Sequence, residues 1–445
     1  MTDDLLNLAE DVLARAKKLG ADSCDALAID AQGTDIEMRE GEIEKLERME
    51  SRGLGLRVFI GQSSAMISGS VFTSDALNRL AETAVAMARV TPPDSFAGLA
   101  AHELLAKDMP KLDLVSSYLP DADKLKALAL DIEGAALAVK GVTKSGGASA
   151  SASSRKMALV TSAGFGQSYQ RTGVSISVSA IAGEGTGMER DYDYSTSCHF
   201  DDLKTPQEVG KNAGERAVKR LNARKIASQS VPVIYDTRVA SSLLGHLSSA
   251  INGAAIARGT SFLKSHMGQQ IFSKSISIID DPLRVRGLAS RPFDGEGLSC
   301  SKRELVADGA LMGWVLDLRS ARQLGLPPTG NGARGLSSPP GPSTSNLHLE
   351  PGHLSPEQMI GSIQQGLYIT ELIGNSVNMV TGDYSRGASG FWIENGQLAF
   401  PVSEITIAGN LRDMFMTLEP ANDLVFKSST NAPSCRVEGL TIAGT

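Results

Sequence analysis

A run of small and apolar residues from Asp236 to Ser261 constrains the fold of this chain more than any other segment. Its large apolar residues recur every three or four positions, which predicts a helix from Asp236 to Ala257 with one face in a core. Small residues beside that face allow a neighbouring element to approach closely. The large residues are Val239, Leu243, Leu247 and Ile251, and the small ones are Ala250, Ala254 and Ala255.

The same helix contains a histidine, as a metal-binding helix does, but no second ligand at the required spacing. His246 is its only strong metal ligand, and the residues three and four positions away are Ser242, Leu243, Ser249 and Ala250. A zinc-binding helix would carry a second histidine or an acid at this spacing. We therefore interpret His246 as a histidine that is hydrogen-bonded at the edge of a packed helix.

Length and composition indicate a soluble globular protein of two or three domains. The chain has 445 residues, of which 42% are hydrophobic and 21% charged. The N-terminal residues begin with acids and alternate at helical spacing, which is not typical of a signal peptide, and no apolar run approaches the roughly 18 residues that span a bilayer. We expect a cytoplasmic protein that does not contact a membrane.

Cysteine spacing argues against a disulfide-rich or zinc-ribbon protein, and local charge argues against a nucleic-acid-binding protein. The four cysteines, Cys24, Cys198, Cys300 and Cys435, are far apart, which favours isolated thiols over a disulfide framework or a zinc ribbon. Residues 1–50 hold fourteen acids and six bases. Because nucleic-acid binding needs a basic surface, we expect no nucleic-acid partner.

The pattern along the N-terminal half predicts two small α+β units. A helix is expected over residues 3–19, then strands at 53–60 and 63–71 that flank a Gly61-Gln62 turn of type II′. Ser74-Asp75 should cap a helix that ends before Thr91-Pro92-Pro93. After an irregular linker, the second unit has helices at 121–139 and from Thr205 to about Leu221, and an alternating strand at 174–180.

The character of the sequence changes near residue 230. A short strand at 231–235 precedes the long helix, and many short apolar runs broken by glycine follow it. Residues 325–343 hold five glycines and five prolines, so they form a long loop. We predict an α+β fold with units at 1–115 and 116–229, and a mixed-sheet, partly barrel-like domain at 230–445.

Four blocks of sequence are too specific to be generic loops. They are DDPLRVRGLASRPFDGEG (280–297), SARQLGLPPTGNGARG (320–335), LYITELIGNSVNMVTGDYSRGASGFWIENGQ (367–397) and VSEITIAGNLRDMF (402–415). They resemble the TldD/TldE family, also called PmbA or modulator of DNA gyrase, and within it the TldE (PmbA) branch. The resemblance implies a cytosolic metalloprotease in which a TldD chain carries a His-Glu-x-x-x-His helix and a distant cysteine around zinc, and a TldE chain pairs with it.

The zinc motif of the sister subunit does not transfer to this chain. Aligned on Arg258-Gly259-Thr260-Ser261, its first histidine falls on Leu244, its glutamate on Gly245 and its second histidine on Ser249. Cys435 lies downstream of the family's cysteine, so it is given no ligand role. A catalytic zinc needs three protein ligands and a nearby base. We therefore predict no metal or cofactor in this chain, and zinc in a TldD partner.

Eight residues are candidates for a substrate cleft or a subunit interface, and none is predicted to be catalytic. The acidic pair in Asp294-Gly295-Glu296-Gly297 could bind a hard cation, although we expect a turn with solvated carboxylates. The segment from Asp383 to Gly387 combines a charge pair with an aromatic ring, and its alternative is a structural turn. The candidates are Arg258, Thr260, Asp294, Glu296, Asn331, Asp383, Tyr384 and Arg386.

Other motifs carry less weight. His199 adjoins Cys198, but neighbouring residues seldom face each other, so we expect no nucleophile pair there. His348 and His353 frame a loop and could meet in space. The glycine-rich segments at 183–187 and 329–335 lack the lysine of a phosphate-binding loop, so no nucleotide site is expected.

The sequence thus predicts a zinc-free partner subunit of a TldD/TldE-type metalloprotease. Its partners would be a TldD-type subunit and an unfolded or short peptide, and alone it could form a homodimer, although the sequence does not fix the oligomeric state of the isolated chain. One alternative is an autonomous metal-dependent peptidase that uses Asp294 and Glu296, or a histidine pair from a different arrangement. The other is a non-enzymatic regulatory protein, for which the gyrase-modulator name is the only hint.

Overall fold

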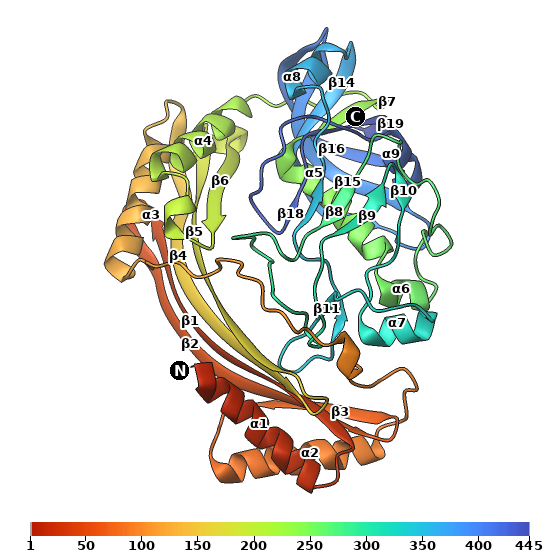
Figure 1. Ribbon diagram of the computed structural model, residues 1–445. Helices are drawn as coiled ribbons and strands as arrows, with labels where there is room; N and C mark the ends of the chain where they lie inside the picture. The colour runs from red at the N-terminus through yellow and green to blue at the C-terminus, as the bar shows by residue number, and fades with distance from the viewer. Residues whose placement is uncertain (1, 445) are drawn as a thin grey trace.

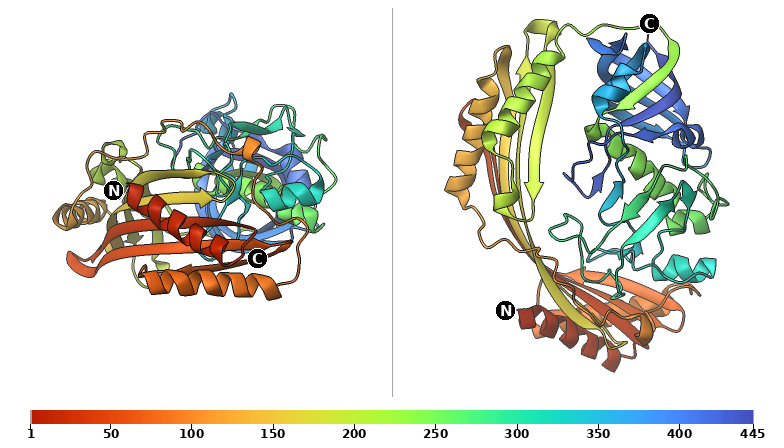
Figure 2. Two further views of the ribbon diagram at one scale, coloured as in Figure 1. Left: turned by 60° about the horizontal axis from the view of Figure 1, so that its bottom comes forward. Right: turned by 45° about the horizontal axis from the view of Figure 1, so that its top comes forward.

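The structure, a computed structural model, describes residues 2–444, and its N-terminal half is built on one antiparallel sheet (Figure 1). The strand order is β3-β2-β1-β4-β5-β6. The long central strands curve strongly, so that the sheet arches around the rest of the chain (Figure 2). The strands are β1 (Ser23–Arg39), β2 (Glu42–Ile60), β3 (Ser63–Gly69), β4 (Val142–Thr161), β5 (Gly166–Ala182) and β6 (Glu189–Ser197).

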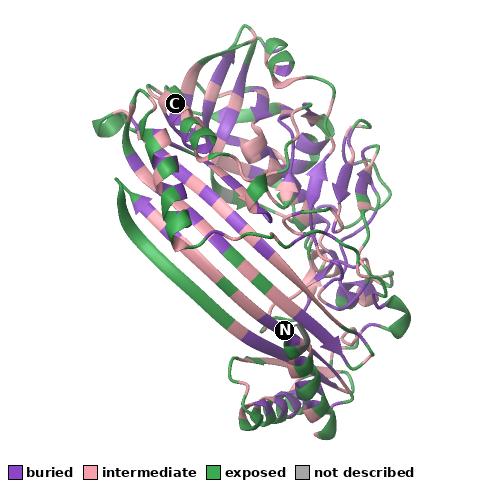
Figure 3. Cartoon of the chain, turned by 60° about the vertical axis from the view of Figure 1, so that its left-hand side comes forward, coloured by how far each residue is buried: buried purple, intermediate pink, exposed green. Residues whose placement is uncertain are grey.

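The two predicted N-terminal α+β segments contribute to the same sheet. β1 pairs with β4 from Asp25↔Thr161 to Met38↔Ala148, so the sheet continues from one segment into the other. Such pairing joins residues more than a hundred positions apart, which local periodicity does not reveal. At the edge of the sheet, the first half of β2 is exposed (green in Figure 3).

Two pairs of helices cover opposite ends of one face of this sheet. Even-numbered residues of β1, such as Ala26 and Ala28 at one end and Ile36 and Met38 at the other, pack beneath these pairs. Because side chains alternate along a strand, the odd-numbered residues point to the other face, here called the inner face. The pairs are α1 (Thr2–Lys18) with α2 (Ser74–Val90), and α3 (Ala122–Leu137) with α4 (Pro206–Lys219).

Most local predictions in this half are confirmed. Strands β2 and β3 pair around Gly61, whose φ of 57° suits the first position of a type II′ turn. Helix α4 begins at Thr205-Pro206 as predicted, and the side chain of Thr205 caps it. The predicted cap of α2 is wrong by one residue, because Thr73 and not Ser74 accepts the hydrogen bond from the backbone N–H of Ala76.

The C-terminal half contains a closed barrel, which confirms the predicted barrel-like domain. Its sheet runs β16-β15-β14-β7-β19-β17, and an additional pairing of β16 with β19 closes a ring of five strands. β7 lies between parallel β14 and antiparallel β19, so the sheet is mixed. The strands are β7 (Gln229–Tyr235), β14 (Gln365–Val377), β15 (Asp383–Glu394), β16 (Gln397–Asn410), β17 (Glu419–Pro420) and β19 (Cys435–Ala443).

The helix predicted from Asp236 to Ala257 is divided in two. It forms α5 (Thr237–Ala250) and α6 (Gly253–Ala257). The side chain of Asn252 caps α6 by accepting hydrogen bonds from the backbone N–H groups of Ala254 and Ala255. In addition, the N–H of Gly253 donates to the carbonyl of Val315 and not to the preceding turn, which ends the first helix.

A second, smaller sheet and several short elements complete the C-terminal half. The sheet order is β10-β9-β8-β13-β18, and the predicted loop at 325–343 is irregular apart from one two-residue strand pair. The sheet strands are β8 (Ile278–Asp280), β9 (Arg303–Ala307), β10 (Ala310–Leu311), β13 (Leu347–Leu349) and β18 (Thr430–Asn431). The others are β11 (Gly332–Ala333), β12 (Gly341–Pro342), α7 (Leu318–Leu324), α8 (Pro356–Gly361), α9 (Leu411–Thr417), η1 (His102–Leu104), η2 (Gly185–Gly187) and η3 (Phe200–Asp202).

One end of the inner face packs on the C-terminal half through apolar side chains. Leu27 and Leu159 pack with Phe293 and Leu298 in a separate apolar cluster. At this junction a Cβ on Gly55 would collide with the backbone of Leu336, so glycine allows the 325–343 loop to lie directly on β2. None of the helices within residues 2–444 is long and apolar enough to cross a membrane.

Candidate functional site

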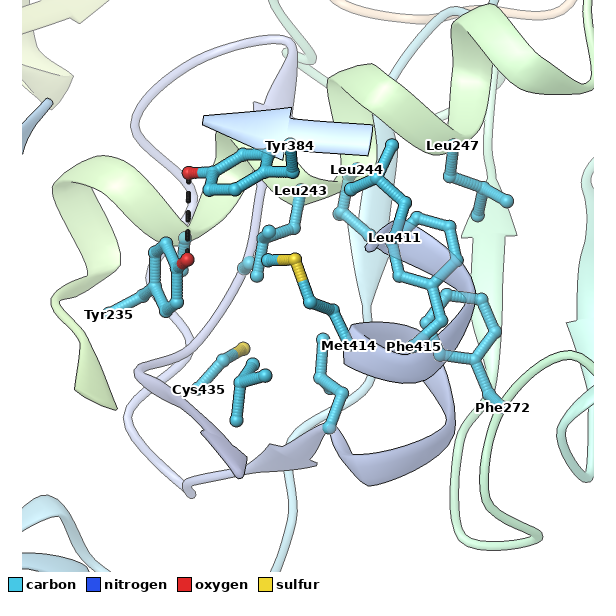
Figure 4. Packing of buried hydrophobic residues seen from close by; sticks show 14 of the residues in the cluster. Tyr235, Leu243, Leu244, Leu247, Phe272, Tyr384, Leu411, Met414, Phe415 and Cys435 are labelled. Carbon is cyan, nitrogen blue, oxygen red and sulfur yellow. Dashed lines mark hydrogen bonds between the residues drawn. The ribbon is translucent and has the colours of Figure 1, made fainter. Parts of the chain in front are cut away.

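Helix α5 places Leu244, on which the resemblance predicts the first histidine of the zinc motif to fall, inside the core. Leu244 is only 2% exposed. Figure 4 shows it between Leu243 and Leu247 in a cluster that includes Tyr384 and Leu411. Side chains of this cluster are packed on all sides, so Leu244 stabilises the domain and offers no donor atom to a metal.

The two other aligned positions lie on the exposed side of α5. Ser249 is exposed, and its hydroxyl donates to the carbonyl oxygen of Gly245 at 2.9 Å. A Cβ on Gly245 would meet no atom within 4 Å, so a longer side chain would fit there. The helix therefore has space for a zinc motif, but its residues provide neither the second ligand nor the base.

His246 does not take over the role of the missing ligands. Its ring packs edge-on against Tyr384, with centroids 5.8 Å apart. Burial and, secondarily, the charge of Arg386 lower the pKa of His246 to about 4. The predicted hydrogen bond is absent at Nε2, which is buried without a partner among the described residues. The imidazole is thus neutral near pH 7 and is a packing residue.

The remaining donors of this region do not complete a metal site. Cys435 is buried in the same core, where its thiol donates to the carbonyl oxygen of Pro433, and burial raises the pKa of Cys435 (Figure 4). Over residues 2–444, no three histidine, cysteine or acidic side chains lie close enough together to hold a metal ion. The donor set of this chain therefore does not fit a catalytic zinc.

A second candidate region lies at the junction between the sheet and the C-terminal half. Asp294 and Glu296 are buried, and the prediction that they are solvated is wrong. Asp294 accepts hydrogen bonds from the backbone N–H groups of Glu296, Leu298 and Gly332, and Glu296 accepts one from Leu318. These contacts hold the 325–343 loop against the turn, so the acidic pair organises the junction.

The pKa of Glu296 is strongly shifted by this environment. Burial is the largest cause, and the neighbouring charge of Asp294 is the next, so that the pKa of Glu296 rises to about 8. Burial also raises the pKa of Asp294. Near pH 7 the Glu296 carboxyl is therefore mostly protonated, because ionising two adjacent buried carboxyls costs both desolvation and electrostatic repulsion.

A buried ion cluster beside the acidic pair joins the two halves of the chain. Arg57 of β2 and Arg334 of the loop both donate to the carboxylate of Asp25, whose exposed fraction is 1%. Burial acts to raise the pKa of Asp25, but the two guanidinium groups outweigh it and hold that pKa below its usual value. No local sequence pattern reveals this cluster, because Asp25 and Arg334 are 309 residues apart.

Family models match nearly the whole chain. PmbA/TldA metallopeptidase domain 1 matches residues 24–88, the central domain matches 116–221, and the C-terminal domain matches 228–444. A metalloprotease PmbA of Escherichia coli O157:H7 is 37% identical over 98% of this chain and 96% of its own length. The chain belongs to the PmbA/TldD family.

A second relative is similar in sequence to this PmbA/TldD chain, and two solved structures share its fold. A PmbA homologue of Haemophilus influenzae is 37% identical over 96% of this chain and 94% of its own length. The crystal structure of a protein from Bacteroides thetaiotaomicron, named as a modulator of DNA gyrase, superposes with a TM-score of 0.91 at 27% identity and covers 99% of this chain and 98% of that one. The structure of TldE from Thermococcus kodakarensis, at 20% identity, shares the fold with a TM-score of 0.86 and covers 98% and 99% of the two chains.

The other predicted site residues do not gather in one place. Asn331 is buried and donates to Asp280 and to the carbonyl of Ser343, so it fixes the loop. Arg258 and Thr260 are exposed after α6. Their role in a cleft or an interface stays a prediction.

The three candidate residues in the segment after Gly382 have different surroundings. Tyr384 lies in the barrel core, where its hydroxyl accepts a hydrogen bond from Tyr235 at 3.5 Å (Figure 4). Asp383 is exposed and accepts from Thr381 and Asn410. Arg386 shares the face of Tyr384, and no ion pair joins it to Asp383 in the part of the chain that the structure describes. The role of these three residues in a cleft or an interface stays a prediction.

The histidine and cysteine motifs have structural roles. Cys198 is buried against Leu112 and Leu114, and Nε2 of His199 contacts the carbonyl oxygen of Asp113 at 2.8 Å. His348 is buried in β13 against Phe426, whereas His353 is exposed. These contacts show no arrangement of a nucleophile and a base.

A groove on the inner face contains residues that sequence analysis did not single out. It adjoins β4, β5 and β6 on one side and residues 427–429 on the other, and it has a volume of about 510 Å³. A neighbouring hollow of about 220 Å³ shares Thr196, Leu288 and Ser428 with it. The alternation of serine and small apolar residues in β4 and β5 was the available signal, since it places hydroxyl groups on one face.

Proposed function

We propose that this chain is the zinc-free partner subunit of a TldD/TldE-type metalloprotease in the cytoplasm. Members of the family are metalloproteases, and the main support for the subunit role is the composition of α5. At the positions of the sister's zinc motif this chain has a core leucine, a glycine and a serine whose hydroxyl bonds its own helix. A TldD-type partner would supply zinc, the base and the attacking water.

The inner face suits an extended peptide better than a folded protein. Its hydroxyl groups are small and half-buried, and they pair across strands, as in the contact of 2.8 Å between the hydroxyls of Ser149 and Ser177. The groove beside them lies between the sheet and the C-terminal half. An unfolded or short peptide could lie there with its main chain hydrogen-bonded, and this chain would provide walls and restrict access.

The first rival function is weakened by the geometry of the acidic pair. An autonomous peptidase would need Asp294 and Glu296 to bind a cation together with other ligands. Instead, both oxygens of Asp294 accept backbone hydrogen bonds, and the raised pKa of Glu296 favours its neutral form. A neutral buried carboxyl is a poor ligand for a hard cation.

The experiment that tests the proposal is reconstitution. The purified chain, a purified TldD-type subunit from the same organism and their mixture are incubated with an unstructured fluorescent peptide. We expect the mixture to cleave the peptide at least about a hundredfold faster than this chain alone, since loss of the ligand set removes the catalytic metal.

A subunit with the first histidine of its zinc motif replaced by alanine is the control. With this variant the mixture should be inactive. Chelator-sensitive cleavage by this chain alone would contradict the proposal and favour the autonomous peptidase. Absence of cleavage in the mixture, with capture of gyrase and not of the TldD-type subunit, would favour a regulatory protein.

A further inference from the structure

The groove on the inner face carries an unusual pair of charges. In the register of β4 and β5, Arg155 lies directly opposite Arg171, and both residues line the groove. Like charges directly opposite one another on a sheet destabilise it. An anion bound between the two guanidinium groups would remove this repulsion.

Lys427 brings a third cation to the same groove from the C-terminal half. It is half-buried, and burial lowers its pKa. Arg155, Arg171 and Lys427 form no ion pair with any described residue, and none of the described residues that line the groove is acidic. Three cations from two parts of the chain thus converge on one hollow, and the acidic residues nearest to Lys427, Asp193 and Asp236, lie outside its lining.

Hydrogen-bond donors accompany the cations. The hydroxyls of Ser153, Tyr194 and Thr196 line the groove, and the guanidinium of Arg171 is held in place by donating to the carbonyl oxygen of Leu288. Arg155 is exposed and has no hydrogen-bond partner through its side chain within residues 2–444, so it is free to engage a ligand. Charged donors around a small hollow are the chemistry that recognises a carboxylate.

We propose that the Arg155–Arg171–Lys427 groove binds a carboxylate of an extended peptide and so gives the protease a preference for anionic substrates. This inference rests on the proposed function and names the substrate class of the same cleft. A polyanion such as nucleic acid fits less well, because the chain has a net charge of −7 and the hollow is confined to about 510 Å³. The carboxylate can belong to an acidic side chain or to the peptide C-terminus.

The test is fluorescence anisotropy with the full-length chain and three labelled glycine-serine octapeptides. The first carries two glutamates and a C-terminal amide, the second two glutamines and an amide, and the third two glutamines and a free C-terminus. We expect the first or the third peptide to bind at least about tenfold more tightly than the second. A preference for the first identifies an acidic side chain, and a preference for the third identifies the C-terminal carboxylate.

The matched variants are Arg155→Glu and Lys156→Glu, which make the same charge change on adjacent residues that point to opposite faces of β4. Arg155→Glu should abolish the preference, whereas Lys156→Glu should leave at least about half of the affinity. Because a glutamate opposite Arg171 replaces repulsion by attraction, Arg155→Glu should melt no lower than the parent chain.

Three results would overturn the inference: equal binding of all three peptides, equal effects of the two variants, or tighter binding of a labelled single-stranded oligonucleotide that Arg155→Glu abolishes. The binding assay uses the chain without a partner subunit. A mixture that cleaves peptides without any charge preference would therefore reject the groove and leave the proposed function intact.

Discussion

Replacing Asp25 by asparagine should destabilise the chain by about 3–5 kcal/mol, because it leaves two buried guanidinium groups without their shared carboxylate. Arg57 and Arg334 both donate to Asp25, and all three side chains are at most 9% exposed. Asparagine keeps the shape of the side chain, so the loss reports the missing charge. The cluster ties β1 and β2 to the 325–343 loop, and we expect the junction to open first.

The measurement is the midpoint of urea-induced unfolding at pH 7, followed by circular dichroism. Asp30→Asn is the matched control, because Asp30 lies on the same strand, is half-buried and forms no ion pair with the described residues. It should change the free energy of unfolding by less than about 0.5 kcal/mol. If both variants unfold at the midpoint of the parent chain, the cluster does not hold the two halves together.

Replacing Glu296 by glutamine should remove a loss of stability at alkaline pH. In the unfolded chain the carboxyl titrates near its ordinary pKa of 4.5, whereas in the folded chain its pKa is about 8. Between these values the folded state retains a proton that the unfolded state releases. The contribution of protonated Glu296 to the free energy of unfolding is therefore complete below pH 4.5. It is lost as the pH rises through 8, by up to about 1.4 kcal/mol per pH unit.

Glutamine imitates the protonated form and can still accept the hydrogen bond from the N–H of Leu318. The variant should match the parent chain near pH 5 and exceed its free energy of unfolding by several kcal/mol, in the range of about 2–4, at pH 8.5. Urea titrations at several pH values measure this difference. Glu82→Gln, on the exposed side of α2, should show no such trend, and a parallel pH dependence for Glu296→Gln and the parent chain would refute the shifted pKa.

Elements with a local signal were predictable from the sequence. The apolar stripe of α5, the Gly61 turn between β2 and β3 and the Thr205 cap of α4 depend on residues within a few positions of one another. The break at Asn252 was missed, because helical periodicity continues across it while the hydrogen bond from Gly253 to Val315 comes from a distant segment.

The candidate sites were harder to predict from the sequence, because they too depend on contacts between distant segments. The absence of a zinc motif could be recognised because a ligand set has a fixed spacing along one helix. The burial of Asp294 and Glu296 depends on the 325–343 loop and on the start of α7, which no spacing within the DGEG segment reveals. The Arg155 and Arg171 pair arises only from the register of β4 with β5.

The central claim is that this chain cannot form the catalytic metal site itself, and metal analysis of the isolated protein tests it most directly. The chain is purified without its partner, equilibrated with zinc at micromolar concentration, passed through a desalting column and assayed by mass spectrometry. We predict less than about 0.1 zinc per chain, because the tetrahedral ligand set is missing. One zinc per chain, retained after desalting, would contradict the claim.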